Sequence, residues 1–493
     1  MLSRRNAMLN ILSAAVMPAA QSFAQTAPSG ANPVTVLQVQ RRSIEVKGKP
    51  ASILAVRQPD GTPGLVTAVG RQFRVRLENK LDVPTLMHWH GLTPPWQQDG
   101  VPGISGPPIP PGGSADYDFP LRFGGTFWMH SHQGLQEQEL LAAPLIIHDE
   151  LDHPNQQEVV VMLADFSFTP PDTIFENLRK GSSMAGMPAP AASKPKALGA
   201  MAMPATPVAA KMAPGSMSSA ASGPDLNDVK YDAFLANDRT LADPEVISVE
   251  PGATILLRVI NSSSMSAYHL DLGRLNGELI AVDGFRIQPM AGRRFPVAVA
   301  QRLDIRIALP REPAAHPVLA VLEGERSQTG LILKAGNRAS ITRLPELAAN
   351  ASSPLNLDLE RRLRAVAPLT KRKADRVHQI NLTGEMAGYV WSINGVPWTK
   401  SVPPLPIAKG ERVELVFQNR TPMPHPMHLH GHEFQVVEID GKRFPGAVRD
   451  TVLVPPNTRV VVAFDANNPG LWAMHCHLLY HLDAGMFSTL RYV

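Results

Sequence analysis

One pattern occurs three times along this chain, and it restricts the fold more than any other feature of the sequence. In each copy a stretch of alternating polar and apolar residues ends at an asparagine, and a histidine follows eight or nine residues later. The copies run from 72–79 to His88, from 253–261 to His269 and from 412–419 to His428. Alternation with a period of two is typical of half-buried β-strands. Three copies of one unit predict three similar β-domains.

The composition agrees with an all-β protein. The 493 residues include 47 Pro and 36 Gly, which favour turns and disfavour long helices. The net charge is only +4, and the densest basic stretch, residues 361–376, contains no aromatic residue, so we expect no nucleic-acid partner. No run of 18 apolar residues follows residue 25, so we also expect no membrane span.

The N-terminus has the features of an export signal. An Arg4-Arg5 pair precedes an apolar stretch, and a small-x-small cleavage site ends at Ala24. We therefore predict a twin-arginine-like signal peptide over residues 1–24, with the general secretory route as the alternative. The mature protein is then expected to be periplasmic or otherwise exported.

Shifts in composition divide the rest of the chain into three domains and a linker. We predict β-domains over 33–149, 157–344 and 377–493, with a linker over 345–376. The second domain carries a low-complexity insertion over 181–222 that contains 6 of the 19 methionines. Soft thioether sulfurs select Cu(I), so we favour Cu(I) capture for this insertion over an incidental linker role.

Four His-x-His pairs lie in the first and third domains. They are His88/His90, His130/His132, His428/His430 and His475/His477. Side chains at i and i+2 leave the same face of a strand, so each pair presents two imidazoles together. Eight imidazoles from two related domains suit two or three metal ions at the interface between those domains. His432 is surplus to these pairs, and we expect it to pack or to form hydrogen bonds.

The single cysteine indicates which metal is bound. One Cys excludes an intrachain disulfide, and Cys476 lies between two histidines of the last pair. Together with His425, His481 and Met486 it forms the two-His, one-thiolate, one-thioether set of blue-copper electron-transfer sites. Zinc fits less well because it seldom takes a thioether ligand. Alternation along the strand directs Cys476 to one side and its two flanking histidines to the other, with about 10 Å between the two sites.

The four motifs together resemble those of the multicopper oxidases, a family that includes laccases, ascorbate oxidase and bacterial copper-resistance oxidases. The matching segments are His88-Trp-His90-Gly91, His130-Ser-His132, His425-Pro-Met-His428-Leu-His430-Gly431 and His475-Cys476-His477-Leu-Leu-Tyr-His481-Leu-Asp-Ala-Gly-Met486. The resemblance implies three cupredoxin-like Greek-key β-sandwich domains and four copper ions. Type 1 copper would take His425, Cys476, His481 and Met486, and type 2 would take His88 and His428. One type 3 copper would take His90, His130 and His477, and the other His132, His430 and His475.

The resemblance also implies a mechanism. Electrons from a reductant would enter at type 1 copper and pass through Cys476 to the trinuclear cluster, which reduces O2 to water. Asp99 stands where the family places a proton-relaying acid, although an Asp-Gly turn is the structural alternative. Some copper-efflux oxidases carry a second acid directly after the second type 1 histidine. Leu482 takes that place here, with Asp483 as a differently placed substitute.

These observations predict an exported enzyme that oxidises Cu(I), phenolic compounds or other small reductants with O2, and that acts in copper tolerance. Two alternatives stay open. One is a general laccase with no role in copper tolerance. The other is a copper-sequestering protein that catalyses nothing, although sequestration does not require a Cys-centred redox site.

Overall fold

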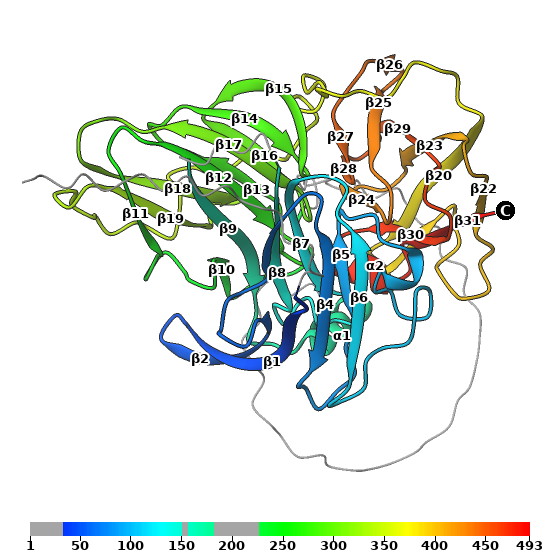
Figure 1. Cartoon of the computed structure of the whole chain (residues 1–493), viewed down its shortest axis with the longest axis horizontal. Coiled ribbons are helices and arrows are strands. Elements are labelled where there is room, and N and C mark those ends of the chain that lie inside the picture. The colour runs from blue at the N-terminus through cyan, green and yellow to red at the C-terminus, as the bar shows by residue number, and fades with distance from the viewer. Residues whose placement is uncertain (1–32, 150–155, 182–225) are drawn as a thin grey trace, which may run out of the picture. The chain divides into compact units, whose positions relative to one another are not determined.

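A computed structural model describes residues 33–149, 156–181 and 226–493. The predicted signal peptide and residues 182–222 of the insertion lie outside the described residues. The described chain is almost entirely β-structure, which confirms the predicted fold class (Figure 1). Its two α-helices are α1 (Pro171–Arg179) and α2 (Leu479–Asp483). The described residues contain no helix long and apolar enough to cross a membrane.

The first pair of sheets is formed by residues 35–148. One sheet has the order β2 (Lys49–Arg57), β1 (Thr35–Val46), β4 (Gln72–Asn79), β6 (Ser114–Pro120). The other has the order β3 (Leu65–Ala68), β8 (Ala142–His148), β7 (Gly125–Ser131), β5 (Met87–His90). We call this the N-terminal sheet pair. Its inward-facing side chains form a separate hydrophobic core that includes Trp89 and Phe73.

The middle sheet pair is formed by residues 157–335. Its first sheet has the order β10 (Ala233–Ala236), β9 (Gln157–Phe166), β12 (Thr254–Asn261), β17 (Arg302–Ala308), β14 (Gly277–Val282), β15 (Phe285–Gly292). Its second sheet has the order β11 (Val246–Val249), β19 (Gln328–Ala335), β18 (Ala314–Leu322), β13 (Tyr268–Asp271), β16 (Arg294–Val297).

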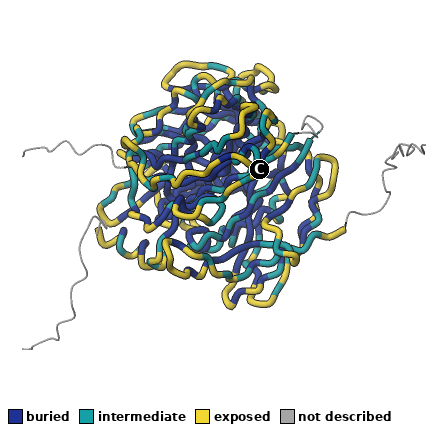
Figure 2. The backbone as a smooth tube through the Cα atoms, turned by 90° about the vertical axis from the view of Figure 1, so that its left-hand side faces the viewer, coloured by how far each residue is buried: buried dark blue, intermediate teal, exposed yellow. Residues whose placement is uncertain are grey.

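The C-terminal sheet pair is formed by residues 376–492. Its first sheet has the order β21 (Val390–Ile393), β20 (Arg376–Glu385), β23 (Arg412–Asn419), β29 (Arg459–Asp465), β25 (Phe434–Ile439), β26 (Lys442–Arg443), and β27 (Val448–Arg449) also pairs with β25. Its second sheet has the order β22 (Leu405–Ile407), β31 (Phe487–Tyr492), β30 (Leu471–Cys476), β24 (His425–Leu429), β28 (Thr451–Val454). In all three pairs the strands are largely buried, and the exposed residues concentrate at turns (Figure 2).

The repeated asparagine has the same structural role in each pair. Asn79, Asn261 and Asn419 end β4, β12 and β23, and all three are fully buried. Each side-chain amide donates to two backbone carbonyls, and each side-chain oxygen accepts the N–H of the residue two positions later. The asparagine thus fixes the turn by which the chain crosses to the second sheet. The histidine-bearing strand of each repeat, β5, β13 or β24, lies in that second sheet.

Candidate metal centres

Strand pairing places the histidine pairs opposite each other. In the N-terminal sheet pair His88 of β5 lies across from His130 of β7. In the C-terminal sheet pair His428 of β24 lies across from His475 of β30. Because the second histidine of each motif is two residues further on, each sheet pair presents four imidazoles at one end of its second sheet.

The two groups of imidazoles meet. The rings of His90 and His428 stack with centroids 3.8 Å apart, and those of His88 and His430 lie 3.9 Å apart. Figure 1 shows β5 and β7 next to β24 and β30, in agreement with these contacts. Sets of three whose ligand atoms all lie within 4.8 Å of one another include His88/His428/His430, His88/His90/His130 and His132/His430/His475. The structure therefore gathers all eight imidazoles around one place, as the sequence predicts.

The cluster is chemically suited to metal ions. Burial, with contributions from neighbouring imidazoles, lowers the pKa of His90, His132 and His430 well below the usual value, so these rings are neutral. Neutral imidazole is the form that binds metal. The buried Nε2 atoms of His88, His428 and His477 have no hydrogen-bond partner, and a buried polar atom left unpaired carries a free-energy cost. Bound metal ions would give these atoms partners, so the residues fit the predicted copper cluster.

Asp99 lies at the junction of the two histidine groups. It follows a short 3₁₀ turn over Trp96–Gln98, and its side chain is buried. Its Oδ2 accepts a hydrogen bond from Nδ1 of His430 at 2.8 Å, and its Oδ1 lies 3.3 Å from Nδ1 of His88. Nδ1 of His88 also lies 2.9 Å from the backbone oxygen of Asp99. Asp99 thus orients one imidazole from each sheet pair, His430 through its carboxylate and His88 through its backbone oxygen. The sequence prediction placed Asp99 near the cluster, and the structure brings it into contact.

Asp450 is a second buried carboxylate at the cluster, and the sequence analysis missed it. Its Oδ1 lies 3.0 Å from Nε2 of His90, and its backbone oxygen lies 2.9 Å from Nδ1 of His428. Arg302 of β17 pairs with both carboxylate oxygens. Burial opposes ionisation of Asp450, but the charge of Arg302 outweighs it and holds the pKa of Asp450 well below the usual value. The middle sheet pair, which has no His-x-His pair of its own, therefore supplies a buried cation to the cluster.

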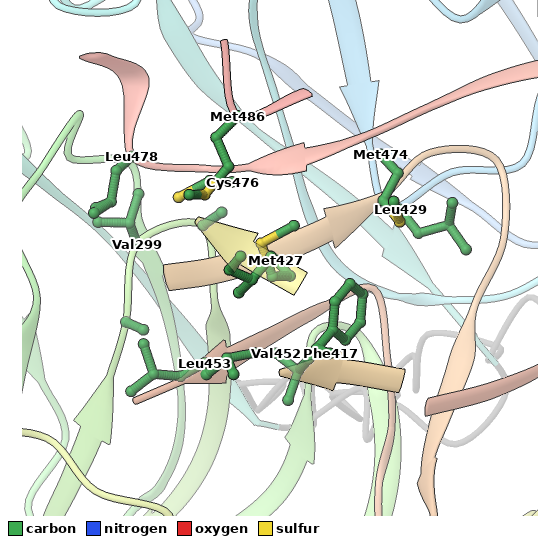
Figure 3. Close-up of a cluster of buried hydrophobic side chains, with 14 of the residues drawn as sticks. Val299, Phe417, Met427, Leu429, Val452, Leu453, Met474, Cys476, Leu478 and Met486 are labelled. Carbon is green, nitrogen blue, oxygen red and sulfur yellow. The ribbon is translucent and has the colours of Figure 1, made fainter. Parts of the chain in front are cut away.

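Cys476, His425 and His481 form the second site. The sulfur of Cys476 lies 3.6 Å from Nδ1 of His425 and 3.9 Å from Nδ1 of His481, and these two nitrogens are 3.2 Å apart. Met486 lies beside Cys476, and its backbone oxygen accepts the N–H of Cys476 (Figure 3). Burial raises the pKa of the Cys476 thiol, so a metal ion must displace its proton to bind. The residues fit the predicted blue-copper set.

Each imidazole of this site is held from its far side. Nε2 of His425 lies 2.7 Å from the hydroxyl of Thr421. Nε2 of His481 lies 2.9 Å from Oδ2 of Asp228, and the Trp391 ring stacks on His481 with centroids 3.9 Å apart. These contacts aim both Nδ1 atoms at Cys476.

Two further sequence predictions, for His432 and Asp483, have different outcomes. His432 hydrogen-bonds to Tyr492 and to the backbone of His430, in agreement with the expectation that it packs or forms hydrogen bonds. Asp483 is exposed, and the charges that act on it are those of Arg179 and Asp172 in α1. It therefore lies toward α1 and does not take the place of a second acid at the cluster.

The sequence analysis also missed Asp228 and Glu137, which contact predicted metal ligands. Glu137 lies 2.8 Å from His130, and Asp228 contacts His481 as described above. Asp228 and Arg302 lie far along the chain from the residues that they hold, and nothing in their local sequence marks them. Glu137 carried a weak signal, since it is an acid only five residues after His132.

Comparisons with known proteins agree with this geometry. Models of the multicopper oxidase family match residues 38–152, 199–337 and 371–492. Multicopper oxidase MmcO of Mycobacterium tuberculosis is 29% identical over 97% of this chain and 91% of its own length. Copper resistance protein A of Escherichia coli is 27% identical over 87% of this chain and 88% of its own. The crystal structure of Fet3p, a multicopper oxidase that functions in iron import, superposes with a TM-score of 0.75 at 18% identity, over 93% of this chain and 90% of Fet3p.

The chain belongs to the multicopper oxidase family. Its sheets have the cupredoxin-like β-sandwich architecture of that family. It is therefore a copper-binding oxidoreductase that uses O2 and a reducing substrate.

Proposed function

We propose that this protein is an exported oxidase that couples one-electron oxidation of Cu(I), and of phenolic or other small reductants, to four-electron reduction of O2 to water, and that it acts in copper tolerance. The observation that carries the proposal is the arrangement of His475, Cys476 and His477. The cysteine sulfur lies against His425 and His481. The two flanking imidazoles lie in the histidine cluster. The peptide between them is the shortest covalent path joining the two sites.

The copper ligands that we propose are those expected from the sequence. Type 1 copper is held by His425, Cys476, His481 and Met486, and type 2 copper by His88 and His428. The type 3 pair is held by His90, His130 and His477 and by His132, His430 and His475. We also propose the domain boundaries 33–149, 157–344 and 377–493 for the three sandwiches.

Bound copper supplies one-electron exchange at the cysteine site and the reduction of O2 at the histidine cluster. The protein's own residues orient the ligands and exclude water. Asp99, which contacts His88 and His430, is proposed to hold a proton at its carboxylate, because reduction of O2 to water consumes four protons. Trp391 and Tyr389 pack against His481 and shield that ligand from solvent.

The contacts of the described residues on either side of the Met-bearing insertion support Cu(I) as a substrate. The described chain stops after α1 and resumes at residue 226. Before the insertion, Phe175 of α1 stacks on Tyr480, which precedes His481 in the chain, with ring centroids 5.9 Å apart. After the insertion, Asp228 contacts His481 itself. The described residues on both sides of the insertion thus contact either the cysteine site or Tyr480 beside it. Two curated relatives also carry the name copper resistance protein A, which supports a role in copper tolerance.

Oxygen uptake by the purified, copper-loaded protein tests the proposal. Uptake is expected with Cu(I) and with a phenol, and deletion of residues 182–222 should lower the Cu(I) rate while it leaves the phenol rate unchanged. Equal rates of Cu(I) oxidation before and after the deletion would favour the general laccase. Absence of uptake with both substrates would favour the copper-sequestering alternative and overturn the proposal.

A further inference from the structure

Glu137 lies in the connection between β7 and β8, directly against the histidine cluster. Its side chain is only 4% exposed. Its Oε2 lies 2.8 Å from Nδ1 of His130, and its Oε1 lies 3.8 Å from Nδ1 of His477. One carboxylate therefore faces an imidazole of the N-terminal sheet pair and an imidazole of the C-terminal sheet pair.

The nitrogens that Glu137 faces are those directed away from the centre of the cluster. Nε2 of His477 is buried without a hydrogen-bond partner, and Nε2 of His130 lies 3.4 Å from Nδ1 of His90 within the cluster. A carboxylate that accepts the Nδ1 proton fixes the tautomer, leaving Nε2 free for a metal ion. Nδ1 of His130 also lies 3.1 Å from the backbone oxygen of Ser131, which favours the same tautomer.

The residues on both sides of Glu137 hold its backbone in place. The side-chain oxygen of Gln136 accepts hydrogen bonds from Thr85 and Ser131, both at 2.8 Å. The side-chain oxygen of Gln138 accepts the hydroxyl of Tyr231 at 2.7 Å. Gln136, Glu137 and Gln138 are all buried. A positioning group is effective only when its own rotamer and backbone are fixed, and these contacts fix them.

We propose that Glu137 is a positioning residue that clamps His130, through the contact with its Nδ1, beside His477, in the orientation that binds one copper of the type 3 pair. The proposal rests on the ligand assignment of the proposed function. Asp99 also contacts one imidazole of each sheet pair, His430 through its carboxylate and His88 through its backbone oxygen.

Two substitutions test the clamp. Glu137→Leu removes both acceptor oxygens, while Glu137→Gln keeps one acceptor for His130 and places an amide N–H toward His477. The matched control is Glu139→Leu, because Glu139 lies two residues away and makes its ion pair with Arg41 at the surface. For each protein, the copper bound per chain is measured after dialysis against increasing concentrations of a chelator. The visible thiolate band of the cysteine site is measured on the same samples.

Loss of a residue that orients a metal ligand typically weakens metal binding about 10–100-fold. Glu137→Leu is therefore expected to retain three coppers where the wild type retains four, with an unchanged thiolate band. Glu137→Gln should bind the fourth copper with intermediate affinity, and Glu139→Leu should match the wild type. Four coppers retained by Glu137→Leu with wild-type affinity would overturn the clamp. Fewer than four coppers in the wild type would instead count against the proposed function.

The melting temperature separates positioning from a structural role. Positioning predicts that copper raises the melting temperature of Glu137→Leu less than that of the wild type, while the copper-free forms differ little. If Glu137→Leu does not fold, the same comparison is made on Glu137→Gln. An equal copper-dependent rise in the wild type and in the folded variant would overturn the proposal.

Discussion

The carboxylate of Asp228 lies 2.9 Å from Nε2 of His481, and it joins the middle segment of the chain to the cysteine site. The same oxygen accepts the hydroxyl of Tyr389, a residue of the C-terminal segment. The middle sheet pair has no His-x-His motif, yet Asp228 and Arg302 both reach the shells of the metal sites. Its function is therefore more than to separate its two neighbours.

The first prediction concerns Asp228. Asp228→Ala should release the His481 ring and weaken copper binding at the cysteine site by about 10–100-fold, because the ring loses the acceptor that fixes its tautomer. Asp228→Asn retains an oxygen acceptor and should stay close to the wild type. Titration of the copper-free protein with copper, followed by the thiolate band, measures the affinity. Wild-type affinity in Asp228→Ala would show that Trp391 alone orients His481.

The second prediction concerns Cys476. Cys476→Ser should lose the thiolate band, bind one copper fewer and consume no O2 with either substrate, because a hydroxyl is a poor ligand for copper. The control is Met427→Leu. Met427 is the cross-strand partner of Cys476 and belongs to the same buried cluster, but it is outside the predicted ligand set (Figure 3). Loss of the band in both variants would point to general damage of the site.

The third prediction concerns the fully buried pair of Arg302 and Asp450. Arg302→Met should lower the free energy of unfolding by about 3–5 kcal/mol, because it leaves a buried carboxylate without its cation. Adding Asp450→Asn to this variant should recover part of the loss, since the second change removes the stranded charge. Urea unfolding of the copper-free proteins measures both effects. A double variant less stable than the sum of the single changes would contradict this account.

The features that could be predicted from the sequence are those that local residue patterns determine. Asn79, Asn261 and Asn419 end strands and fix turns within their own repeats, so the repeat located both the strands and the histidines that follow them. Alternation along a strand also correctly predicted that the imidazoles flanking Cys476 turn away from its sulfur. All of these relationships act over a few residues of chain.

Relationships between distant segments were outside the reach of the sequence. Arg302 contacts Asp450 across 148 positions, and Asp228 contacts His481 across 253. An arginine or aspartate in an ordinary strand or loop has no local mark of such a contact. Only the packing of the sheet pairs brings these charged groups to the candidate metal sites, so a single sequence indicated the candidate ligands and Asp99 but not Arg302 or Asp228.

The last prediction concerns the pH dependence of stability that Glu323 introduces. Burial raises the pKa of Glu323 to about 7, and the backbone N–H of Leu355 donates to its Oε1 at 2.6 Å. Between the unfolded pKa of 4.5 and about 7 the folded state binds more protons, so stability from this group is present at low pH and lost as pH rises through 7. Relative to Glu323→Gln, the wild type should lose up to about 3 kcal/mol between pH 4.5 and pH 8. Urea unfolding of both copper-free proteins at each pH tests this, and parallel pH profiles would contradict it.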